Sequence, residues 1–164
     1  MMTREGKMDA ISDFENGYSV VDELIRNIGR DELQFLPLIQ DAWSINDFLV
    51  HFLDADQSLA FRMRTAIAEP GKEVPVWDEE AWRDRLHYGD EDGLACLALA
   101  KGIRGFLAIG LRSVVDEDWD GMYIAHPVRG KLKLLDLIDM YQQHVIFHLP
   151  LIRRNMRSWS ERRI

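Results

Sequence analysis

The last third of the chain contains the stretch Lys131-Leu-Lys-Leu-Leu-Asp-Leu-Ile-Asp-Met-Tyr141-Gln-Gln-His144-Val-Ile-Phe-His148-Leu149. Its apolar residues recur at helical spacing through Leu134, Leu137 and Tyr141, which predicts an amphipathic helix starting near Lys131. His144 and His148 continue the apolar side of this helix. At i, i+4 spacing two imidazoles lie one above the other, about 5–6 Å apart at Cβ, so both can reach one metal ion.

The rest of the chain predicts three more long helices. They run from about Ala10 to Ile28, from Ser44 to about Glu69 and from about Asp90 to Val115, with a short helix over Asp78–Leu86. Pro150 should kink or end the last helix, because proline removes the donor that would reach Ile146. No β-hairpin signal competes. The sequence therefore predicts a single all-α domain over residues 1–164, a four-helix bundle with long crossover connections and a short extra helix.

A third histidine, His51, lies on the predicted helix that begins at Ser44, as a site assembled across a bundle core requires. Three neutral nitrogen ligands leave a coordination position open for water or substrate, which is typical of a reactive metal site. We therefore predict that His51, His144 and His148 bind a divalent metal. The alternative is three core histidines satisfied by backbone carbonyls and water. Imidazole suits zinc, nickel, iron and copper, so the ligands leave the metal open.

Other polar residues near these helices are weaker candidates. Asp54, the candidate catalytic residue, could accept the second N–H of His51, position a bound water or simply face solvent. Lys101 and Arg104 could anchor an acidic thiol cofactor, or they could belong to a solvated helix face. We expect His87 and His126 in loops or at the surface, from which either could reach over the site as a lid.

Composition narrows the class of protein. An apolar fraction of 47% is normal for a globular chain, and a net charge of −8 opposes non-specific nucleic-acid binding. The one cysteine, Cys96, lies in an apolar run and predicts an inert buried thiol. The N-terminus lacks an apolar signal-peptide core, and no apolar stretch approaches about 20 residues, so we expect no membrane span and a cytoplasmic location. Arginines near the C-terminus suit a helix end better than an anion-binding patch.

Three short motifs, taken in order, resemble the DinB/YfiT-like superfamily of metal-binding four-helix bundles. They are Trp43-Ser44-Ile45, His51-x-x-Asp54 and Tyr141-x-x-His144-x-x-x-His148, and the resemblance covers roughly residues 14–156. It implies a divalent metal, zinc or nickel before iron, at the three histidines, and a homodimer. Characterised relatives include enzymes that move or add low-molecular-weight thiols, which implies a thiol-dependent S-transferase acting on a small-molecule substrate. Family helices commonly continue past the second histidine, so Pro150 is a departure.

Two other functions stay open on the sequence. The same site could serve a metal-dependent hydrolase using metal-bound hydroxide, since that chemistry needs only the open position and a shaped pocket. A non-enzymatic dimeric bundle could instead sense or store a metal or ligand. We expect neither nucleic acid nor a membrane as a partner.

Overall fold

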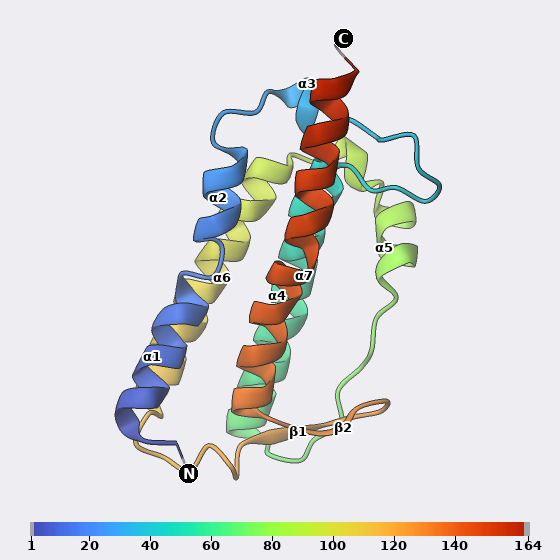
Figure 1. The fold of residues 1–164 in the computed structure, drawn as a ribbon. Helices are drawn as coiled ribbons and strands as arrows, with labels where there is room; N and C mark the ends of the chain where they lie inside the picture. The colour runs from blue at the N-terminus through green and yellow to red at the C-terminus, as the bar shows by residue number, and fades with distance from the viewer. Residues whose placement is uncertain (1, 163–164) are drawn as a thin grey trace.

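The computed structural model describes residues 2–162. Three long helices and one pair of shorter helices in line form a four-helix bundle, which confirms the predicted fold class (Figure 1). The long helices are α4 (Ile45–Ala68), α6 (Gly93–Ser113) and α7 (Leu134–Glu161), and the pair is α1 (Arg4–Glu15) with α2 (Ser19–Ile25). The shorter elements are α3 (Arg30–Leu33), α5 (Glu79–Leu86), the 3-10 helix η1 (Tyr88–Asp90) and the strands β1 (Tyr123–His126) and β2 (Gly130–Lys133).

The connection between α4 and α6 sets the topology. Both helices begin at the same end of the bundle, where the backbone N–H of Gly93 donates to Asn46 Oδ1 at 3.0 Å. A Cβ at Gly93 would lie 2.6 Å from that oxygen, so the close approach requires glycine. The chain must therefore return along the whole bundle after α4, and it does so on the outside, carrying α5 (Figure 1).

Helix starts follow local sequence closely. Ser44 accepts the Asp47 N–H, and the Asp47 carboxylate accepts the Ser44 N–H, which forms a capping box at the predicted helix start. Asp78 caps α5, and Asp92 caps α6 through two backbone N–H groups. These side chains satisfy N–H groups that have no partner inside the helix.

The predicted helix over residues 10–28 is wrong in its bounds. α1 begins at Arg4, and the chain breaks over residues 16–18 before α2. Gly17 lies in this break, and a Cβ there would clash with the guanidinium of Arg104 on α6. The break therefore coincides with a contact to a residue distant in sequence. The apolar pattern of the N-terminal segment does not predict this break.

A β-hairpin lies in and just beyond the segment predicted as a strandless crossover. β1 pairs antiparallel with β2, and the tight turn ends at Gly130, whose φ is 71°. The β1 backbone also bonds to the chain after α4, since Val74 N–H donates to the Ala125 carbonyl. Strands of four residues carry little periodic signal and are stabilised here by that packing. Because β2 extends to Lys133, α7 begins later than predicted.

α7 continues through Pro150, so of the two predicted outcomes, a kink or an end, the helix end is wrong. Proline removes the hydrogen bond to the carbonyl of Ile146. Ile146 and Pro150 both lie on the exposed side of α7, where water can hydrate that carbonyl. The rest of the helix is retained by its buried face.

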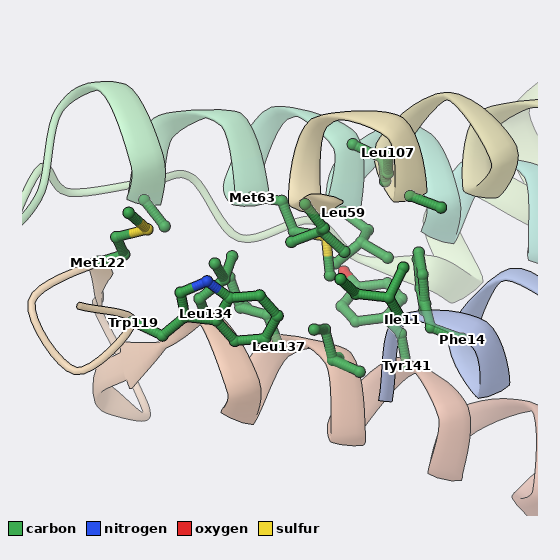
Figure 2. Close-up of a cluster of buried hydrophobic side chains, with 14 of the residues drawn as sticks. Ile11, Phe14, Leu59, Met63, Leu107, Trp119, Met122, Leu134, Leu137 and Tyr141 are labelled. Atoms are coloured by element: carbon green, nitrogen blue, oxygen red, sulfur yellow. The ribbon is translucent and has the colours of Figure 1, made fainter. Parts of the chain in front are cut away.

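Two apolar clusters fill the bundle, one towards the hairpin and one towards the opposite end. Figure 2 shows the first, in which side chains from α1, α4, α6 and α7 meet and Trp119 and Met122 cover the end. Beside these clusters lies a buried ion pair. Arg104 Nε donates to Asp56 Oδ2 at 2.8 Å, and the Tyr18 hydroxyl donates to the same carboxylate at 3.0 Å. Arg104 and Asp56 are both 0% exposed.

α6 is long and apolar enough to cross a membrane by length and composition, contrary to the expectation that no stretch reaches that length. The core helix of a soluble protein passes the same test, and 39% of this stretch is buried against the rest of the bundle. Its charges, Lys101, Arg104 and Arg112, are spread among apolar residues, which is why simple inspection underestimates the stretch.

Candidate metal centre

Three histidine nitrogens meet at the middle of the bundle. His51 is on α4, and His144 and His148 are one turn apart on α7. His144 Nε2 lies 2.8 Å from His51 Nε2 and 3.0 Å from His148 Nε2. One nitrogen from each ring lies within 4.8 Å of the others, so the three rings offer one ion three ligands.

Burial keeps these imidazoles neutral. Desolvation lowers the pKa of His51 to about 3, of His144 to about 2 and of His148 to about 4. Repulsion between the rings contributes for His51 and His144, and the positive charge of Arg104 also lowers the pKa of His144. A neutral imidazole offers a lone pair, which is the form that binds a metal.

The donor set fits a divalent cation. Each neutral ring carries one N–H, so three Nε2 atoms facing one another cannot all find donors among themselves, whereas one cation accepts all three lone pairs. The Nδ1 atoms of His51 and His148 are buried and have no hydrogen-bond partner within residues 2–162. Asp54 therefore does not accept the second N–H of His51, contrary to the expectation from sequence.

Aromatic rings hold the imidazoles in place. Trp43 contacts His51 edge-on at 5.2 Å between centroids, and Trp77 lies 5.6 Å from the same ring on another side. Phe48 packs against His148 at 5.1 Å. These neighbours restrict the rotamers of the rings and exclude water from most of their surface, so the three nitrogens are preorganised.

Glu79 is the site residue that the sequence analysis missed. Its Oε2 lies 3.9 Å from His51 Nε2, and the pKa of its carboxyl is raised by partial burial and by the charges of Glu80 and Asp78. In the sequence it is one of three acidic residues at a helix start, a pattern already explained by capping. No spacing rule connects it to His51, because the long crossover brings α5 against α4.

Two cavities reach the histidines. The first, called here the His144 cavity, has a volume of about 330 Å³. The second, called the His148 cavity, has a volume of about 240 Å³. The lining of the His144 cavity includes Arg62, Trp77, Glu79, His126, Tyr141 and His144. Glu79 lines both cavities.

The other predicted site residues lie elsewhere. Asp54 is buried, accepts a short hydrogen bond from the Tyr88 hydroxyl and lines neither cavity. Lys101 is on the outer face of α6, where it pairs with Asp22. Arg104 is not on a solvated face, because it is fully buried and bonded to Asp56. Burial and this ion pair leave Arg104 inaccessible to a thiol cofactor, which corrects that expectation.

His87 and His126 differ in outcome. His87 is exposed at the end of α5, with φ 56°, as predicted for a loop-edge residue. His126 is 7% exposed and lines the His144 cavity, so its predicted surface position is wrong. β1 turns this residue inward. Cys96 is buried, and burial with nearby Glu91 raises its thiol pKa to about 11, which confirms an inert thiol.

No family model matches the chain. The curated sequence of YfiT from Bacillus subtilis strain 168, whose name gives metal-dependent hydrolase as a provisional activity, is 24% identical over 129 residues, 76% of this chain and 71% of that protein. A solved YfiT structure from Bacillus subtilis, described as a probable metal-dependent hydrolase with an unusual four-helix bundle topology, matches with a TM-score of 0.84 at 19% identity. It covers 98% of this chain and 91% of that chain.

The chain has the YfiT-like fold. The resemblance expected from the sequence motifs is thereby confirmed. In this YfiT-like bundle the three histidines lie at one point, as the motifs implied. The homodimer and the thiol implied by the same resemblance stay predictions.

Proposed function

We propose that this chain is a metal-dependent hydrolase of a small molecule, with His51, His144 and His148 as metal ligands and Glu79 as the base. The observation that carries the proposal is the meeting of three neutral imidazole nitrogens beside a carboxylate, at a point reached by open cavities. The provisional activity in the name of YfiT supports the same reaction class. A divalent cation in such a site lowers the pKa of a bound water or thiol and polarises a substrate carbonyl.

Glu79 provides the proton transfer that hydrolysis needs. Its carboxylate lies next to His51, and the residue lines both cavities, so it can accept a proton from an attacking water. As the water oxygen bonds to the substrate carbon, that proton moves to Glu79, and Glu79 then returns it to the leaving group as the carbon–leaving-group bond breaks. The neutral imidazoles add no negative charge, so they leave the cation its full polarising effect.

Thiol transfer is the second candidate, and the pair of cavities favours it. A transferase must hold a thiol and an electrophile together, and Glu79 lines both cavities. Here the sulfur–carbon bond would form as the leaving group departs, with the thiol proton passing to Glu79. A bound metal would lower the pKa of a thiol as it lowers that of water, so the histidines and Glu79 would have the same roles in thiol transfer.

One assay separates these reactions. Zinc- or nickel-loaded protein is tested against small esters, amides and halides, with and without low-molecular-weight thiols. Acids from the esters and amides, or alcohols from the halides, formed without thiol identify a hydrolase. Thioesters or thioethers formed only with thiol identify a transferase. Glu79→Gln should lower kcat by about 100-fold or more at unchanged metal content, as expected for loss of a general base. Asp84→Asn, at an exposed position of the same helix that lines neither cavity, is the matched control. Loaded protein with no turnover on the panel, or a fully active Glu79→Gln variant, contradicts the proposal.

A further inference from the structure

Arg62 on α4 is a buried cation without a counter-ion. It is 6% exposed, and within residues 2–162 no carboxylate lies at ion-pair distance from it. Its Nη1 donates to the Tyr141 hydroxyl at 2.9 Å, and its Nη2 donates to the Pro75 carbonyl at 3.2 Å. Its Nε is buried and has no partner in that part of the chain. Two neutral acceptors therefore hold the guanidinium in position without neutralising it.

Arg104 shows how the same bundle treats a buried arginine with a structural role. Arg104 is fully buried, and Asp56 neutralises it through two hydrogen bonds. Burying a charge costs free energy unless it is paired. An arginine that is buried and held in place but left unpaired is consistent with an anion supplied from outside the chain.

Arg62 faces a place where such an anion could bind. It lines the His144 cavity together with Arg129, which is exposed at the hairpin turn, and with Glu79 at the histidines. Two guanidinium groups and the carboxylate residue Glu79 thus line the same cavity. The apolar part of the lining includes Trp77 and Met140.

His126 offers a third donor to the same cavity. Its Nδ1 accepts the backbone N–H groups of Val128 and Arg129, each at 3.2 Å, so the hydrogen of the neutral ring is on Nε2. Burial lowers the pKa of His126, and the positive charges of Arg62 and Arg129 lower it further. The charges of both guanidinium groups therefore act on this ring.

We infer that the His144 cavity is a carboxylate-recognition site in which Arg62 binds the acid group of a small organic acid, with Arg129 at the rim. The planar guanidinium is suited to bidentate binding of a carboxylate. A volume of about 330 Å³ is at the small end of ligand pockets, so the ligand is small. This inference rests on the proposed function only for the reaction. It adds that the substrate carries a carboxylate at one end and has its reactive bond near His144.

The test measures binding without turnover, using benzoate and its neutral analogue benzamide as probes on metal-free protein. Metal-free protein excludes direct coordination of the acid to a cation. Calorimetry should give wild-type protein at least a 10-fold preference for benzoate, because charge-assisted hydrogen bonds are the strong ones. Arg62→Gln should remove that preference. Arg64→Gln is the matched control, since Arg64 is on the same helix but exposed and stacked over Phe106. It should keep the preference.

Further measurements distinguish failure of this inference from failure of the proposed function. Equal binding of benzoate and benzamide by wild-type protein overturns the inference even if Arg62→Gln fails to fold. Inorganic phosphate that binds through Arg62 more tightly than benzoate overturns the assignment to carboxylates. Arg62-dependent benzoate binding in a protein without hydrolase or transferase activity contradicts only the proposed function. Metal-dependent activity without benzoate preference contradicts only this inference.

Discussion

At the scale of single residues, the centre depends on His144 more than on either partner. Its Nε2 is the nitrogen in contact with both His51 and His148, which are on different helices. The apolar pattern correctly placed His144 and His148 on the inner side of a helix. An i, i+4 pair also arises by chance, so the meeting with His51 is the stronger observation.

Replacing His144 with alanine should reduce bound metal from near-stoichiometric to background, because a site with two imidazoles and no third ligand binds zinc or nickel far more weakly. Elemental analysis of protein reconstituted and then dialysed measures this. His87→Ala, at the exposed end of α5, is the control and should load normally. A folded His144→Ala protein with full metal content would show that the three rings are only core residues.

At the scale of elements, the breaks and starts of helices depend on contacts of different range. Capping at Ser44 and Asp92 uses residues two or three positions away, and the sequence predicted helix starts at Ser44 and near Asp90. The break between α1 and α2 goes with Gly17 packed against Arg104, which is on a different helix. The hairpin similarly depends on backbone bonds to the chain around Val74.

Two glycine substitutions separate these effects. Gly17→Ala should lower the free energy of unfolding by about 1–3 kcal/mol, since the new methyl group displaces a guanidinium held by Asp56. Gly102→Ala on α6 should raise it by about 0.5–1 kcal/mol, because nothing lies near its Cβ position and alanine favours helix. Urea unfolding measures both. A Gly17→Ala protein as stable as wild type would mean that Arg104 moves freely.

At the scale of the whole molecule, a metal at the three histidines would tie α4 to α7 across the bundle. These helices are separated in sequence by the crossover, α6 and the hairpin. A ligand that binds only the folded state stabilises it, by about 2.7 kcal/mol when present at 100 times its Kd. The metal is therefore expected to act on the stability of the entire bundle.

Chelation should lower the Tm of wild-type protein by about 5–10 °C, given about 2–4 °C for each kcal/mol in a chain of this size. Circular dichroism melts before and after chelation measure the shift. The His144→Ala variant should melt at the same temperature in both conditions. An equal shift in wild type and variant would place the stabilising metal somewhere other than these histidines.

The amino-acid sequence by itself determined the bundle, the helix start at Ser44 and the three histidines that come together in it. These features depend on spacing within one helix, and hydrogen bonds or apolar stripes over a few residues leave a direct trace in the sequence. The sequence also indicated that His51 belongs to this cluster, because His51 lies on the apolar face of its helix. The same local rules failed at Pro150, since the buried face of α7 outweighs one lost hydrogen bond at the surface.

Only the tertiary structure decided which charged groups serve the site. Arg104 was expected either to anchor a thiol cofactor or to lie on a solvated face and is buried with Asp56, whereas Glu79 was not among the predicted site residues and lies beside His51. Arg62 attracted no notice in sequence because its unpaired state is a property of its surroundings. Burial and pairing of a charge depend on elements brought together by the long crossover, and no pattern within one segment records them.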